Sequence, residues 1–134
     1  KPISAICSFA PFVSSMEMAA AMKVIEIIKR DGVIERLWSV GERFQRELSQ
    51  LVDGSPLKTR VIGIAPMPHL VFELEDEVAN EKVKMAFYAE AADRGVYFHP
   101  NHHWFVNFAH TDEDVTRTMD VCAAALKVAE QVVG

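Results

Sequence analysis

The chain has 134 residues, of which half are hydrophobic and a quarter charged, a composition typical of one globular domain with its own core. Its net charge is −5 and no basic stripe runs along it, which argues against a nucleic-acid partner. The apolar runs are too short for a membrane span or a signal peptide. Because the sequence does not begin with Met, we expect it to be a piece of a longer protein.

The chain has two cysteines, Cys7 and Cys122, which are far apart in the sequence and show no CxxC spacing. Such lone cysteines are typical of reduced residues that pack in the core of a cytoplasmic protein.

Two helices are predicted in the first part of the chain. The first, over Met16–Arg30, has apolar residues every three or four positions, which indicates one buried face; they are Met18, Met22, Ile25 and Ile28. Asp31-Gly32 ends this helix, since glycine accepts the left-handed conformation that closes a helix. The second helix, over Val33–Val52, carries a stripe of Leu37, Val40, Phe44, Leu48 and Leu51.

Two strands are predicted after the turn at residues 53–56. Arg60–Ile64 is rich in β-branched residues, and Leu70–Leu74 alternates between side chains of the two faces. Pro66 and Pro68 exclude a helix between them, so we expect an extended or looped connection.

The remaining chain predicts a helix, two further strands and a last helix. Asn80 can cap the third helix and Gly95 ends it, with Val83, Ala86, Phe87 and Ala91 facing inwards. Strands are expected at Val96–Phe98 and Trp104–Phe108. Thr111 then caps a helix whose first turn is acidic and whose apolar seam is Val115, Met119, Cys122, Leu126, Ala129 and Val133.

These elements predict an α+β fold, with a small, mainly antiparallel sheet covered by helices in the order α-α-β-β-α-β-β-α.

Four of the five histidines fall between His99 and His110, around a Pro-Asn turn. Imidazoles gathered in this way can hold zinc, copper or nickel. His102 and His103, however, would point to opposite faces of a strand, and no cysteine or acid stands at a regular spacing. We therefore expect these histidines to line a pocket rim or the strand ends, and predict no native metal site.

Other sources of chemistry are weaker. Ser8, Ser14 and Ser15 lack the GxSxG elbow of a hydrolase, and Cys7 is expected to be an inert small hydrophobic residue. The glycines are too scattered for a phosphate-binding loop. From the residues alone, we predict no catalytic residue in this chain.

The order of these motifs resembles the C-terminal part of class III pyridoxal-phosphate-dependent aminotransferases, in particular the glutamate-1-semialdehyde aminomutase-like branch. The resemblance covers about Met16–Val133. It rests on an Ala-rich helix at Met18–Ile25, a helix break at Asp31–Trp38, and a closing strand pair with a helix cap at Gly95–Pro100 and Phe105–Asp114.

This resemblance implies a division of the chain and a set of roles. Residues 1–15 would be a remnant of the large domain, and residues 16–134 the C-terminal small α+β domain with its leading helix. The lysine that binds the cofactor would lie upstream of residue 1, so the chain alone would be inactive. Ser14 and Ser15 would approach the cofactor phosphate. The substrate would be met by His99, Asn101, His102 and His103.

The implied protein is a cytoplasmic, homodimeric pyridoxal-phosphate enzyme that transfers an amino group to or from a carbonyl, or exchanges it within one molecule. Its substrate would be of the small amino-acid or amino-sugar type, and this domain would close over it. Two alternatives stay open. One is a free-standing module that binds a metal or another ligand through the His99–His103 turn, and the other is a dimerisation domain whose apolar first helix binds a partner.

Overall fold

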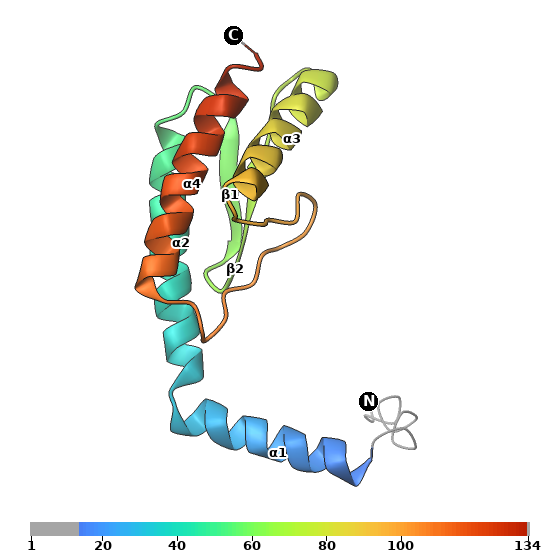
Figure 1. The fold of residues 1–134 in the computed structure, drawn as a ribbon, viewed down its shortest axis with the longest axis vertical. Helices are drawn as coiled ribbons and strands as arrows, with labels where there is room; N and C mark the ends of the chain where they lie inside the picture. The colour runs from blue at the N-terminus through green and yellow to red at the C-terminus, as the bar shows by residue number, and fades with distance from the viewer. Residues whose placement is uncertain (1–13, 134) are drawn as a thin grey trace, which may run out of the picture. The chain divides into compact units, whose positions relative to one another are not determined.

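The computed structural model describes residues 14–133, in which four helices and a two-stranded sheet are found (Figure 1). Their order is α1 (Ser15–Arg30), α2 (Val33–Asp53), β1 (Thr59–Ile64), β2 (Met67–Phe72), α3 (Glu77–Asp93) and α4 (Asp112–Glu130). The predicted α+β class and antiparallel sheet are confirmed, but the order is α-α-β-β-α-α. The chain divides into two compact units between Glu35 and Arg36, and each is described by itself.

None of the described helices is both long and apolar enough to cross a lipid bilayer. Cys7, Ser8 and most of the predicted large-domain remnant lie outside the described residues.

The helix α1 has the predicted ends but not the predicted burial. Ser14 caps it, and Gly32 follows its last residues with a φ of 59°, as the Asp31-Gly32 pair predicts. None of its residues is buried: Met18, Met22 and Ile25 are 59%, 72% and 52% exposed, so the expectation of a buried face was wrong for this chain. An apolar stripe specifies that a helix needs a partner, but not that the partner belongs to the same chain.

The second unit is built around one hydrophobic core. From α2, the buried side chains are Val40, Phe44, Leu48 and Val52, whereas Leu37 and Leu51 of the predicted stripe are only partly buried. α3 packs against α4 and β2 (Figure 1). The largest fully buried side chains are Phe87, Leu48, Leu70 and Val83, and each contributes about 1.5–3 kcal/mol through burial.

The strands β1 and β2 form an antiparallel hairpin closed by Ala65-Pro66, with Ile64 opposite Met67 and Thr59 opposite Phe72. The second strand therefore begins earlier than the predicted Leu70 and contains Pro68. Proline is tolerated there because Pro68 stands on the edge of the sheet that faces away from β1.

The two predicted strands Val96–Phe98 and Trp104–Phe108 are absent from the described structure, and their segment is irregular. The amides of Trp104 and Val106 donate to the carbonyl oxygens of Pro68 and Pro66, at 2.9 and 3.0 Å. The amide and carbonyl of a strand residue point to the same edge, and proline has no N–H to return. The segment therefore lies along β2 through bonds donated in one direction only, and no third strand of a ladder forms.

The helix α3 begins earlier than predicted, because Asp76 caps it by accepting from the amide of Ala79 at 2.8 Å. Asn80 instead lies inside the helix and accepts from the amide of Leu74 at 3.0 Å. At the other end Gly95 has a φ of 86°, and the amides of Gly95 and Val96 donate back to the last turn. This is a Schellman ending, as a glycine at this position predicts.

The helix α4 begins with the predicted cap. Thr111 Oγ1 accepts from the amide of Asp114, and the Asp114 carboxylate accepts from the amide of Thr111 at 2.8 Å. The predicted seam is buried except at Val133, which is 47% exposed beyond the helix end. Arg43 of α2 donates to the Asp112 carbonyl and the Thr116 hydroxyl, so α2 holds the start of α4 in place.

Gly41 provides a test of the packing between α2 and the hairpin. An added Cβ would overlap the carbonyl of Ala65. Alanine normally stabilises a helix interior relative to glycine by about 1 kcal/mol. We expect the opposite sign for Gly41→Ala, a loss of about 1–3 kcal/mol in the free energy of unfolding from the forced overlap. Urea denaturation followed by circular dichroism measures it.

The matched control is Gly54→Ala, since an added Cβ there would meet nothing closer than 3.6 Å. It should leave stability unchanged or slightly raised. Equal effects of the two substitutions would contradict the close approach at Gly41.

Candidate functional site

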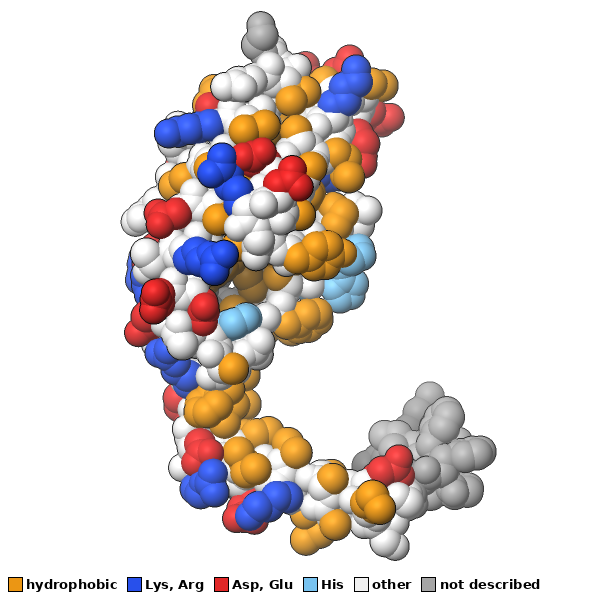
Figure 2. All heavy atoms as spheres, in the orientation of Figure 1, with side chains coloured by type: hydrophobic (Ala, Val, Ile, Leu, Met, Phe, Trp, Pro, Cys, Tyr) orange, Lys and Arg blue, Asp and Glu red, His pale blue; other side chains and the backbone are white. Residues whose placement is uncertain are grey.

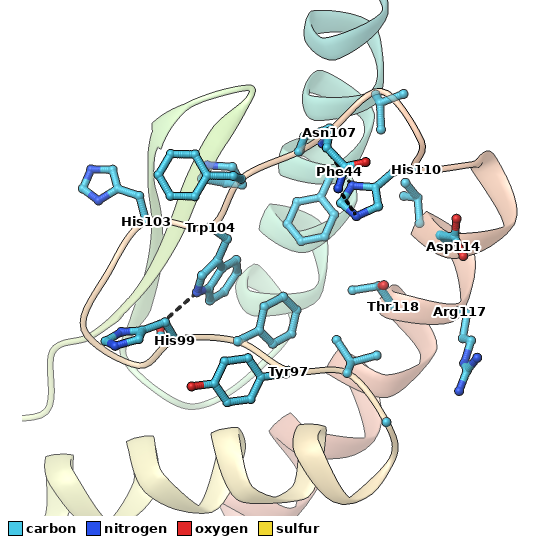
Figure 3. A pocket seen from close by; sticks show the side chains of 18 residues that line it. Phe44, Tyr97, His99, His103, Trp104, Asn107, His110, Asp114, Arg117 and Thr118 are labelled. Carbon is cyan, nitrogen blue, oxygen red and sulfur yellow. Dashed lines mark hydrogen bonds between the residues drawn. The ribbon is translucent and has the colours of Figure 1, made fainter. Parts of the chain in front are cut away.

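The segment between α3 and α4 is held in place by Trp104. Its ring is 8% exposed and packs on Phe98, with ring centroids 4.1 Å apart, and edge-on against Phe44 and Tyr88. Its indole Nε1 donates to the carbonyl of His99 at 3.0 Å (Figure 3). One aromatic residue thus fixes both ends of the turn His99–His103 to the core.

The turn itself is polar and exposed. The amide of Asn101 donates to Nδ1 of His99 at 3.2 Å, so this nitrogen accepts and is unprotonated in this arrangement. Lys84 of α3 donates to Oδ1 of Asn101 at 3.2 Å. Nδ1 of His102 lies 2.9 Å from the carbonyl of His103, which requires the proton of His102 on Nδ1.

The structure brings a fourth histidine to this turn. His69 of β2 stacks on His103, with ring centroids 5.9 Å apart and planes 5° from parallel. The ring of His102 lies next to that of His103, and the ring of His99 lies next to that of His102, each at a centroid separation of 5.9 Å. We call these four side chains, His69, His103, His102 and His99, the histidine ladder. Sequence reasoning missed His69 because it lies 30 residues or more from the others.

His69 is the least exposed member of the ladder. Its Nδ1 is buried and has no hydrogen-bond partner. Burial lowers the pKa of His69 below its ordinary value of 6.5, and the neighbouring charges of His103, His102 and His99 lower it further, while a hydrogen bond with the backbone of His102 acts in the opposite direction without cancelling them. The net effect favours the neutral form of the His69 imidazole.

Beside the ladder is a pocket of about 560 Å³. Its floor is apolar, with Phe44, Phe98, Trp104 and Val115, and its rim is polar, with His110, Asn107, Asp114, Arg117 and Thr118 (Figure 3). His110 is bonded to Asn107 at the rim, where its Nδ1 accepts from the Asn107 amide at 3.2 Å. A hydrophobic floor with a few convergent polar groups is the usual form of a small-molecule site.

The predicted substrate residues divide into two groups. His99 and His103 line the pocket, whereas Asn101 and His102 stand on the exposed side of the turn. His110 also lines the pocket and was noted in the sequence only as part of the histidine cluster. In Figure 2, histidine side chains reach the surface near exposed hydrophobic ones, and Tyr97 and Phe105 of this segment are 79% and 57% exposed.

No three metal-binding side chains converge within the described part of the chain. The four ladder rings form a row in which successive ring centroids are 5.9 Å apart. This arrangement does not support the metal-binding alternative.

Known proteins resemble this chain over most of its length, although no protein-family profile matches it. The 3-aminobutyryl-CoA aminotransferase of Cloacimonas acidaminovorans is 28% identical over 86% of the chain. The glutamate-1-semialdehyde 2,1-aminomutase of Methanosarcina acetivorans is 26% identical over 80% of it. The FumI protein of Sphingopyxis sp. MTA144, solved in its pyridoxal-phosphate internal aldimine form, superposes on 88% of the chain with a TM-score of 0.78 and 30% identity.

The homologues of this chain are class III pyridoxal-phosphate-dependent aminotransferases and aminomutases. The predicted resemblance is thereby confirmed. The chain spans about a quarter of the length of these relatives, between 27% and 28%.

In such an enzyme the cofactor requires a lysine, an acid against the pyridine nitrogen and a site for its phosphate. The described residues that fit one of these needs are Ser14 and Ser15, at the start of α1, where helix amides favour an anion. The Ser14 amide already donates to the Glu17 carboxylate at 2.6 Å, and the Ser14 hydroxyl accepts from the Glu17 amide. A phosphate would have to displace Glu17 from this position.

Cys122 does not fit a nucleophile. It is a free thiol in the core, fully buried on α4, and burial raises its pKa from 9.0 to about 12. The thiolate is the reactive form of cysteine. This environment agrees with the predicted inert role.

We expect Cys122 of a Cys7→Ala variant to react with iodoacetamide at pH 8 about 1000-fold more slowly when folded than in urea, since three pH units separate the two thiol pKa values. Mass spectrometry over time measures the rate. Equal rates in the two conditions would show that Cys122 is accessible in the folded chain.

Proposed function

We propose that residues 16–134 are the C-terminal small domain of a class III pyridoxal-phosphate-dependent aminotransferase or aminomutase, and that residues 1–15 are a remnant of its large domain. The observation that carries this proposal is the superposition on FumI, in which 88% of this chain matches 28% of a protein solved with pyridoxal phosphate. The parent enzyme would transfer an amino group to or from a carbonyl, or exchange it within one molecule.

The domain would close over the substrate and help to form a cytoplasmic homodimer. The unburied apolar residues of α1, among them Met18, Met22 and Ile25, support a contact with another polypeptide surface. The free, buried thiol of Cys122 fits a reducing compartment.

In the parent enzyme pyridoxal phosphate supplies an electron sink for amino-group chemistry. This chain would contribute positioning groups and would not be catalytic by itself, because the lysine that binds the cofactor would lie outside it. Ser14 and Ser15 would contact the cofactor phosphate through their hydroxyls and the first amides of α1, with Glu17 turned away.

The substrate would be of the small amino-acid or amino-sugar type. His99 and His103 reach the pocket, and His102 and Asn101 extend the same turn. Neutral imidazoles and an amide can both donate to and accept from hydroxyl and carboxylate oxygens. This set of groups suits a polar substrate better than an apolar one.

The first test asks whether the chain binds the cofactor covalently. We expect the 134-residue chain mixed with pyridoxal phosphate to show no more imine absorption than the same chain in urea, where only surface lysines react. Borohydride reduction followed by mass spectrometry counts the adducts. One specific adduct, present in the folded chain and absent in urea, would contradict the proposed dependence on an outside lysine.

The second test concerns the turn in the intact enzyme. We expect the double substitution of His102 and His103 by Ala to raise KM about tenfold or more with kcat little changed, the cost of losing about 1.5 kcal/mol of hydrogen bonding to substrate. The double Asn variant keeps polar groups at both positions and should recover part of the affinity. Unchanged kinetics in both variants would restrict these histidines to a structural role.

A further inference from the structure

The histidine ladder joins two segments that are distant in the sequence. His69 belongs to β2, whereas His99, His102 and His103 belong to the turn that follows α3. Within the ladder, the two segments meet at the parallel stack of His69 on His103. The Trp104 ring lies edge-on to His69, with centroids 5.7 Å apart, and so borders the same contact.

Two observations show that this arrangement requires neutral imidazoles. Nδ1 of His99 accepts from the amide of Asn101, and a proton on that nitrogen would abolish the bond. Nδ1 of His69 is buried without a partner, so a proton added to this nitrogen would find no acceptor. Stacked imidazolium rings would also repel each other across the contact.

The charged groups around the ladder do not offset such a charge. From α3, Lys84 adds a positive charge at Asn101 and is itself paired with Glu81. On the face of the sheet shared with His69, Arg60 of β1 is paired with Glu73. The neighbouring charges that shift the pKa of His69 are those of His103, His102 and His99, and no carboxylate is among them.

We propose that the histidine ladder is a proton-operated latch, which holds the His99–His103 turn against β2 while its imidazoles are neutral and releases the turn when they are protonated. The ligand of this site is the proton itself. The inference does not depend on the proposed enzymatic function, because it concerns contacts within residues 69–104 alone.

The direction of the pH dependence follows from His69. Its pKa in the folded chain lies below the ordinary value of 6.5. The latch contact is therefore fully present above pH 6.5 and is lost as the pH falls below that value towards the folded pKa. At pH 8 the turn is held, and in mild acid it detaches while the core helices remain.

Trp104 reports on the latch, because it contacts His69 and donates to the carbonyl of His99. In a Trp38→Phe variant it is the single tryptophan. We expect its emission to shift to longer wavelength between pH 8 and pH 5, with a midpoint below 6.5, while far-ultraviolet circular dichroism stays constant. The Cε1–H resonance of His69, followed by NMR, should titrate with a midpoint below 6.5.

Three further substitutions in the same background isolate the ladder. His69→Phe keeps an aromatic ring against Trp104 but cannot titrate, and should remove the transition. His103→Asn changes an exposed residue, does not disturb the core, and should move the midpoint to higher pH, because it removes the repulsion that lowers the pKa of His69. His110→Asn removes a histidine outside the ladder and should leave the transition unchanged.

The proposal is overturned if Trp104 emission is constant from pH 8 to pH 5. It is equally overturned if the transition persists unaltered in both His69→Phe and His103→Asn, or if it coincides with loss of helix. Should His69→Phe fail to fold, the shift in His103→Asn decides the matter.

Discussion

Where the segment after α3 meets the hairpin, Pro66 and Pro68 offer carbonyl acceptors but no amide donors. Trp104 and Val106 donate to these carbonyls and receive nothing in return. The segment is therefore attached to the sheet at two points but is not incorporated as a third strand. This one-sided attachment lets Trp104 enter the core while the turn before it stays irregular and polar. The pocket and the histidine ladder both depend on that combination.

The features that could be predicted from the sequence are those decided within a few residues. Thr111 and Asp114 satisfy each other's amides, and Gly95 takes the positive φ that ends α3, so both helix ends follow from local chemistry. Asn80 was predicted to cap α3, and this was wrong, because Asp76 caps the helix. Asn80 instead accepts from Leu74, whose amide requires an acceptor. That bond joins the residues after β2 to α3, and no short sequence pattern predicts it.

In the candidate site too, the features that could be predicted are those that depend on residues close together in the sequence. Clustering of His99, His102 and His103 follows from their adjacency, and their nearness to a pocket was predicted. His69 could not be placed with them, because its position depends on the hairpin register and on how the later segment lies along β2. The face of α1 was predicted correctly as apolar and wrongly as buried. Periodicity identifies the face of a helix but carries no information about which chain covers it.

Fold stability does not explain why a histidine occupies position 69. A buried ring nitrogen without a partner costs about 1–3 kcal/mol relative to a satisfied or apolar group. Val71, the next residue of β2 on the same face as His69, shows what such a site normally holds. A valine or phenylalanine would avoid the cost. An imidazole offers in return a charge that appears in mild acid, and the stack on His103 places that charge where it opposes the attachment of the turn. The destabilising group is thus located at the one contact between β2 and the turn that a proton can break.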